Sequence, residues 1–145
     1  MKNPIPFLLA FVALSVSSFA KDGWTADFDK GLAKAKVEKK IALVDFTGSD
    51  WCSWCMKLDK EIFSTAAFKD YAKDNLLLVE IDFPQIKPLH RDVQAKNDAL
   101  GAKYKIEIFP SVLVFSSEGK QIGKLSYTAG GPAAFIAELE KITKK

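Results

Sequence analysis

Three near-continuous apolar runs, at 41–46, 76–81 and 111–115, most constrain what this chain can fold into. Runs of this length are typical of strands that are covered on both faces of a sheet. The first run contains one carboxylate among its apolar residues, Asp45. We therefore expect three central strands in a sheet with helices on both sides.

Amphipathic segments alternate with these runs and predict helices. Apolar residues recur at spacings of three and four in the segment at about 25–40, after residue 55, before residue 105, and after Pro132. A turn at Glu118-Gly119 joins the third run to a hairpin partner at 122–127. The predicted order is α β α β α β β α. Strands joined through helices imply parallel pairing and the hairpin adds an antiparallel edge, so we expect an α/β fold with a mixed sheet.

Length and charge indicate one globular domain without a nucleic-acid footprint. The chain has 145 residues, of which 48% are hydrophobic and 27% are charged, and this balance excludes disorder. The 21 basic and 18 acidic residues leave a formal net charge of only +3, and they alternate instead of forming runs.

The N-terminal segment 1–20 has the pattern of a signal peptide. Lys2 supplies a positive charge, the stretch at 7–16 is apolar but too short to span a bilayer, and Ser18 and Ala20 are small residues at the positions that a signal peptidase recognises. The alternative is an uncleaved membrane anchor. With cleavage after residue 20, the mature domain is 21–145, without a membrane anchor and outside the cytoplasm, where disulfides persist.

Both cysteines of the chain lie close together, at Cys52 and Cys55, just after the first strand and at the start of a helix. The free N–H groups and the dipole of a helix N-terminus stabilise an anion, so Cys52 can ionise below the pKa of about 8.5 of a free thiol. Cys55 lies one helical turn away and can close a disulfide with it. The pair therefore predicts a redox-active dithiol.

Two other interpretations of the cysteines stay open at this point. A structural zinc site needs four ligands, and the chain adds only the single His90 to its two cysteines. A permanent structural disulfide across so short a loop constrains little chain entropy. We expect neither, and we expect no metal site.

The motifs together resemble the thioredoxin family over nearly all of the expected mature chain. They are Val44-Asp45-Phe46, Trp51-Cys52-Ser53-Trp54-Cys55, Phe109-Pro110-Ser111 and the Glu118-Gly119 hairpin. More narrowly, the segment 45–55 resembles secreted bacterial thioredoxin-like proteins with the motif DFTGSDWCxWC. The resemblance implies a thioredoxin fold with an extra N-terminal helix and a dithiol/disulfide site beside a cis-proline loop.

The resemblance also implies roles for individual residues. Cys52 matches the exposed nucleophile and Cys55 the resolving cysteine. Pro110 matches the cis-proline, and Phe109 before it offers backbone groups to an extended substrate. Asp45 matches the carboxylate that takes the proton of the second cysteine. A lone aspartate in an apolar strand also has a physical reason for a raised pKa, although it is open whether it serves only structure.

Several departures from the family limit this transfer. Ser53-Trp54 stands where thioredoxins have Gly-Pro, and neither residue is cationic, so we expect a reducing to intermediate potential. The lysine that accompanies the buried aspartate in thioredoxins falls near Leu78 in this chain. Trp51 and Trp54 form a platform for a peptide substrate or pack on the helix, and the sequence leaves both open.

The expected function is an exported thiol–disulfide oxidoreductase, periplasmic or secreted, that acts on disulfide-containing proteins without a metal or organic cofactor. Resemblance to periplasmic relatives implies a thiol electron donor in the envelope. We expect a monomer. The alternatives are a binding module that holds peptides through Trp54, Phe109 and Pro110 with a disulfide that never cycles, and a disulfide isomerase, although isomerases of this kind usually add a dimerisation domain. Electron delivery for cytochrome maturation is also open.

Overall fold

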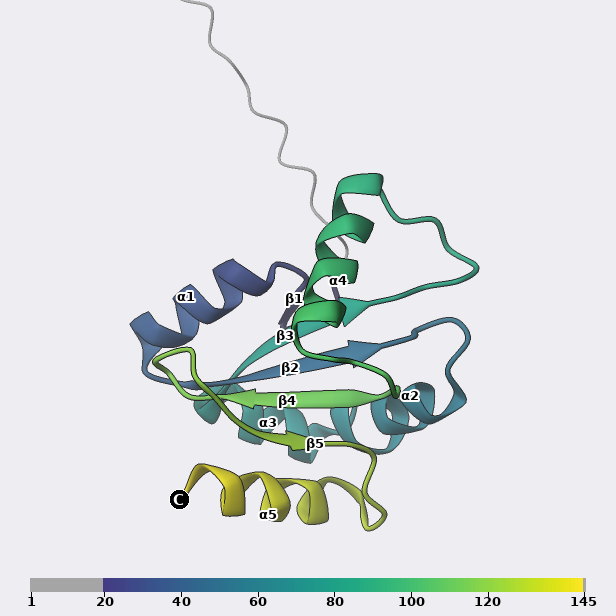
Figure 1. Cartoon of the computed structure of the whole chain (residues 1–145). Helices are drawn as coiled ribbons and strands as arrows, with labels where there is room; N and C mark the ends of the chain where they lie inside the picture. Colours follow the sequence, from purple (N-terminus) through teal and green to yellow (C-terminus); the bar gives the residue numbers. More distant parts are fainter. Residues whose placement is uncertain (1–19, 145) are drawn as a thin grey trace, which may run out of the picture.

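The computed structural model describes residues 20–144, which form one mixed sheet with helices on both faces (Figure 1). Apart from Ala20, the expected signal peptide lies outside the described residues. No helix within residues 20–144 is long and apolar enough to cross a membrane.

The sheet contains five strands in the spatial order β1-β3-β2-β4-β5. Their bounds are Trp24–Thr25 for β1, Ile41–Thr47 for β2, Leu76–Asp82 for β3, Ser111–Phe115 for β4 and Gln121–Leu125 for β5. The three apolar runs and the hairpin partner are thus confirmed as strands. The two-residue β1, which pairs in parallel with β3, was not predicted; Thr25, expected at the start of the first helix, belongs to it, and α1 begins at Phe28.

The direction of β4 differs from the expectation. β2 and β3 are parallel, but β4 runs antiparallel to β2 although it follows β3 through a helix. Thr47 at the end of β2 pairs with Asp82 at the end of β3, and Phe46 pairs with Ser111 at the start of β4. β3 thus ends at the same end of the sheet, measured along the strands, at which β4 begins. The connecting helix does not return the chain to the other end of the strands, so the inference of parallel pairing was wrong for β4.

The helices begin and end at recognisable caps. Their bounds are Phe28–Glu38 for α1, Ser53–Leu58 for α2, Asp59–Phe63 for the π-helical turn η1, Ala66–Asn75 for α3, Arg91–Lys103 for α4 and Gly131–Thr143 for α5. Asp27 caps α1 by accepting a hydrogen bond from the amide of Lys30, and Lys39 ends it in the left-handed conformation. Thr65 caps α3 in the same way, which explains the break in the helix that follows the cysteines.

The helices cover the two faces of the sheet and create two apolar cores (Figure 1). On one face, α1 and α4 pack over Val44, Phe46 and Phe115. On the other face, α2, η1, α3 and α5 enclose a core that includes Leu43 and Phe135. The expected fold class is confirmed, including the additional N-terminal helix α1. The cysteines lie at one end of the sheet, where β2 and β3 end and β4 begins.

Candidate active site

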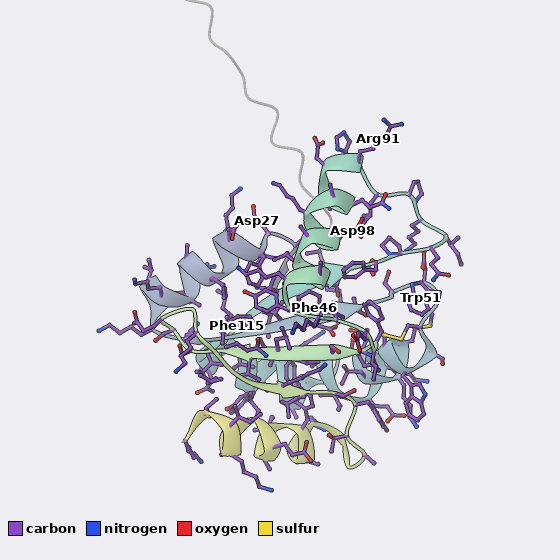
Figure 2. The ribbon with its side chains drawn as sticks, viewed as in Figure 1. Asp27, Phe46, Trp51, Arg91, Asp98 and Phe115 are labelled. Carbon is purple, nitrogen blue, oxygen red and sulfur yellow. A yellow bond between two sulfur atoms is a disulfide. The ribbon has the colours of Figure 1, made fainter. Side chains whose placement is uncertain are left out.

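The two cysteines form a disulfide at the start of α2 (Figure 2). Cys52 is the N-cap residue, in extended conformation, and its Cα lies 5.2 Å from that of Cys55. The backbone N–H of Cys55 donates a hydrogen bond to Cys52 Sγ at 3.2 Å. A donor at this position stabilises a thiolate on Cys52 when the disulfide is reduced.

Both cysteines are more enclosed than the sequence suggested. Cys52, expected as an exposed nucleophile, is 7% exposed, and Cys55 is 4% exposed. The reason is local, because Cys52 Sγ is turned toward Cys55 and the helix amide. Two large aromatic side chains beside them do reach solvent, since Trp51 and Trp54 are 38% and 55% exposed.

Trp51 packs against the loop that precedes β4. The Phe109–Pro110 peptide bond in this loop is cis, and Pro110 is buried. The rings of Trp51 and Phe109 meet edge-to-face with centroids 5.6 Å apart. The indole N–H of Trp51 also donates a hydrogen bond to the carbonyl of Phe83 at 2.7 Å, and Gly48 leaves no room for a Cβ beside the indole. Trp51 is therefore held in place by its neighbours.

Trp54 has different partners and forms no shared stack with Trp51. Its ring lies 5.3 Å from that of Tyr127. The ammonium of Lys57 lies over both rings, 5.1 Å from the centroid of Trp54 and 4.9 Å from that of Tyr127. Trp54 thus packs partly on its own helix and still presents about half of its surface to solvent.

Asp50 joins the active-site loop to the loop that follows β3. Its carboxylate accepts hydrogen bonds from the backbone N–H groups of Gln85, Ile86 and Lys87 at 2.8 to 2.9 Å. Burial raises the pKa of the Asp50 carboxyl, but these amide donors outweigh it and lower the pKa below its ordinary value. Ser49 makes two further hydrogen bonds to the side chain of Asp82. The two loops are therefore joined by direct bonds.

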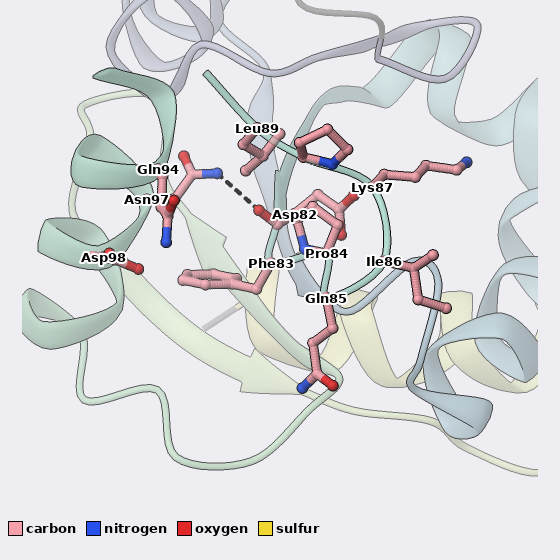
Figure 3. A pocket seen from close by; sticks show the side chains of 11 residues that line it. Asp82, Phe83, Pro84, Gln85, Ile86, Lys87, Leu89, Gln94, Asn97 and Asp98 are labelled. Atoms are coloured by element: carbon pink, nitrogen blue, oxygen red, sulfur yellow. Dashed lines mark hydrogen bonds between the residues drawn. The ribbon is translucent and has the colours of Figure 1, made fainter. Parts of the chain in front are cut away.

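A pocket of about 390 Å³ lies between the second of these loops and α4 (Figure 3). Residues 82–89 line it together with Gln94, Asn97 and Asp98, and neither cysteine takes part. The amide of Asn97 donates a hydrogen bond to the carbonyl of Asp82 across its floor. Within residues 20–144, no group of three or more His, Cys, Asp or Glu side chains is arranged to hold a metal ion.

Asp45 is buried in the middle of the sheet, on β2, and is 2% exposed. Burial raises the pKa of its carboxyl to about 7, against the charge of Lys21, which lowers it. The direction agrees with the expectation from the apolar strand. Asp45 Oδ1 has no hydrogen-bond partner within residues 20–144.

The charged groups around Asp45 were not predicted from the sequence. Lys21 Nζ lies 2.7 Å from Asp59 Oδ1 and 2.7 Å from Glu80 Oε2. Glu80 was detectable as the second carboxylate in an apolar run, because the parallel register places it beside Asp45. Lys21 gave no signal, since it precedes every predicted element. Leu78, where the lysine of thioredoxins falls, is buried in the core and carries no charge.

The fold and the disulfide together define a class of protein. A mixed sheet in this strand order, with a Cys-x-x-Cys disulfide at the N-terminus of the helix after β2 and a cis-proline before β4, is the arrangement of a thioredoxin-fold thiol–disulfide oxidoreductase. The chain belongs to the thioredoxin-like domain family, whose sequence profile matches residues 28–143.

Individual relatives agree with this assignment. The chain is 35% identical over 117 residues to the disulfide bond reductase DsbH of Chlamydia pneumoniae, covering 81% of this chain and 70% of that protein. It is 31% identical over 117 residues to the thiol:disulfide interchange protein DsbD of Pseudoalteromonas atlantica (strain T6c / ATCC BAA-1087), covering 80% of this chain but 18% of that protein. A solved structure of a DsbH oxidoreductase superposes with a TM-score of 0.76 at 30% identity, over 91% of this chain and 94% of that one.

Proposed function

We propose that the protein is exported and that it reduces or exchanges disulfides in other proteins by cycling Cys52 and Cys55. The observation that carries the proposal is the disulfide at the start of α2, with the Cys55 amide directed at Cys52 Sγ. The name of one relative, a disulfide bond reductase, supports the reductive direction, and the name of another, a thiol:disulfide interchange protein, supports disulfide exchange.

The first step is an attack by Cys52. Its thiolate attacks one sulfur of a substrate disulfide, forms a mixed disulfide with that sulfur and releases the other sulfur as a thiolate. The helix N-terminus and the Cys55 amide lower the cost of holding the thiolate before attack.

The second step is resolution by Cys55. Its thiol gives a proton to Asp45, and the Cys55 thiolate attacks the sulfur of Cys52 in the mixed disulfide. The Cys52–Cys55 bond forms, the bond between Cys52 and the substrate breaks, and the substrate sulfur leaves as a thiolate. Two electrons have then passed from the protein to its substrate. Asp45 suits the acceptor role because burial raises its pKa to about 7, close to neutral pH.

Substrates are proposed to bind along the aromatic side chains beside the disulfide. Trp51 and Trp54 offer partly exposed indole rings, and the loop of Phe109 and Pro110 offers backbone groups to an extended segment. We propose a monomer that is recharged by a thiol electron donor in the envelope, because a reductase in an oxidising compartment needs a source of electrons.

Single-cysteine variants test the activity. Cys52→Ser is expected to abolish insulin disulfide reduction, because it removes the attacking thiolate. Cys55→Ser is expected to trap the mixed disulfide, visible as a covalent adduct on a non-reducing gel. Activity retained by Cys52→Ser would refute the proposal.

The reduction potential distinguishes a cycling disulfide from a static one. Tryptophan fluorescence across a glutathione series is expected to give a value between the thioredoxin end, roughly −270 mV, and the isomerase range near −180 mV. A disulfide that never equilibrates with glutathione would instead support the peptide-binding module, for which the half-exposed Trp54 on Tyr127 is the favouring observation. Recovery of activity by scrambled ribonuclease would support the isomerase.

Export is tested separately. N-terminal sequencing of the protein from the envelope fraction of a producing bacterium is expected to begin at Lys21. A protein that retains residue 1, or that fractionates with the cytoplasm, contradicts export by a cleaved signal peptide.

A further inference from the structure

The ammonium group of Lys21 is held between two carboxylates from different elements. Its Nζ lies 2.7 Å from Asp59 Oδ1 at the start of η1 and 2.7 Å from Glu80 Oε2 near the end of β3. The same nitrogen lies over two aromatic rings, 4.7 Å from the ring centroid of Trp24 and 5.6 Å from that of Phe63. These partners fix a side chain that in solution moves freely about its four-carbon stem.

Asp45 lies next to this ion cluster. It is the register partner of Glu80 in the parallel β2–β3 ladder, so both side chains leave the same face of the sheet as neighbours. Leu43, two residues earlier on β2, belongs to the core under α2 and η1, and Asp45 shares its face. The sheet face that carries Asp45 and Glu80 is therefore the one covered by the helix that bears Cys55.

The groups that face Asp45 carry one positive and several negative charges. Burial raises the pKa of Asp45, the charge of Lys21 lowers it, and the charges of Glu80, Asp59 and Asp82 raise it. Burial also lowers the pKa of Lys21, but its carboxylate neighbours outweigh this and raise it, so Lys21 stays protonated at neutral pH. Of these groups, Lys21 is the one that favours the ionised form of Asp45.

We propose that Lys21 is a positioning residue of the redox site, whose charge beside Asp45 keeps that carboxylate able to accept the proton of Cys55. The inference rests on the proposed function, in which Asp45 is the acceptor during resolution. Lys21 does not reach the reacting sulfur atoms and acts through Asp45. The segment that precedes α1 thereby becomes part of the chemistry.

The test is a titration of the Asp45 carboxyl in the oxidised protein. Carbon-13 NMR of carboxyl-labelled aspartate follows it, and the resonance is assigned by its loss in Asp45→Asn. In Lys21→Met the midpoint is expected to move upward by about one pH unit, the lower end of what a nearby opposite charge supplies. Lys21→Arg keeps the charge and is expected to return the midpoint toward that of the wild type. An unchanged midpoint in Lys21→Met overturns the proposal.

A matched control separates local from general charge effects. Lys30→Met removes the same charge from an exposed side chain whose ion pair is with Asp27, at 3.5 Å. Its Asp45 midpoint is expected to equal that of the wild type, because solvent screens a distant exposed charge. A shift as large as that of Lys21→Met would mean that net charge alone matters, and the proposal would fail.

A second variant keeps the proposal testable if Lys21→Met does not fold. Glu80→Gln removes a negative charge beside Asp45, so the midpoint is expected to move downward, opposite to the effect of Lys21→Met. An upward shift or none would contradict a charge cluster around Asp45. Loosened packing alone does not give shifts of opposite sign.

Failure of the Lys21 proposal can be distinguished from failure of the proposed function. Asp45 titrates in the disulfide form, without substrate or turnover, so the midpoints bear on Lys21 alone. Loss of the proposed function shows instead in Cys52→Ser, which would retain insulin reduction. If both hold, the pH profile of Cys55 attack on a mixed disulfide is expected to shift upward in Lys21→Met together with the Asp45 midpoint.

Discussion

Replacing Asp45 by asparagine is expected to make the oxidised protein more stable relative to the wild type as pH rises from 4 to 8. The pKa of this carboxyl is about 7 in the folded protein against an ordinary value of 3.8. As pH rises between these values, the unfolded chain loses its proton first, so the folded state becomes relatively less stable. The loss begins above the ordinary value and is complete above the folded one. The asparagine side chain does not ionise, so the variant escapes this loss.

The size of the effect follows from the separation of the two pKa values. At 1.36 kcal/mol for each pH unit, a separation of about three units corresponds to about 4 kcal/mol. The free energy of unfolding of a domain is about 5–15 kcal/mol, so the change is a large fraction of the whole. The variant also buries the asparagine amide. The free-energy cost of burying that amide does not depend on pH, so it cancels when the stabilities at two pH values are compared.

Urea unfolding of the two oxidised proteins near pH 8 and near pH 4 measures this difference. The advantage of Asp45→Asn is expected to grow by about 4 kcal/mol between the two conditions. Asp70→Asn, on the exposed side of α3, serves as the control and is expected to show a far smaller change. An advantage of Asp45→Asn that is the same at both pH values would refute the reasoning, because the buried carboxyl would then have no raised pKa.

Three further changes test other parts of the structure. Gly48→Ala places a Cβ inside the indole of Trp51 and is expected to lower insulin reduction about tenfold, equal to ~1.4 kcal/mol; wild-type rates would contradict a fixed Trp51. Phe135→Ala, in a fully buried position, is expected to cost about 3–5 kcal/mol in urea unfolding, whereas Val37→Ala, 82% exposed, changes it by less than about 0.5; equal effects would contradict the assigned core. Asp50→Asn is expected to speed hydrogen exchange at the three amides that Asp50 binds. In the wild type the same release follows as pH falls below the lowered pKa of Asp50, and exchange that is unaltered by either change would refute the link between the loops.

Local sequence patterns predicted the elements of this fold better than their pairing. The apolar runs at 41–46 and 76–81 are long and continuous, and each became a strand with nearly those bounds. Trp24–Thr25 is too short to show an alternation of apolar and polar residues, and it is a strand only because it pairs with β3. The antiparallel direction of β4 depends on where α4 returns the chain, which no local pattern records.

The candidate site was predictable as far as its residues are close in sequence or match a family motif. Cys52 and Cys55 follow from their spacing, and Asp45 from a carboxylate in an apolar strand. Lys21 was not predictable, because a single lysine before the first helix has no distinguishing neighbour, and its contact with Glu80 joins residues far apart in the chain. The enclosure of Cys52 was missed as well, since the resemblance supplies a role and not the packing of the oxidised form.

The two outer strands of the sheet bear on where the proposed protein substrates can bind. An unfolded protein can add a strand to any long, flat, unpaired sheet edge. Here β1 offers two residues on one side, and β5 on the other side carries the exposed Lys124 and is joined to β4 through an irregular register at Val114/Phe115. Neither edge is a good template for strand addition. Under the proposed function, the sheet edges therefore do not compete with the surface around the disulfide for extended substrate segments.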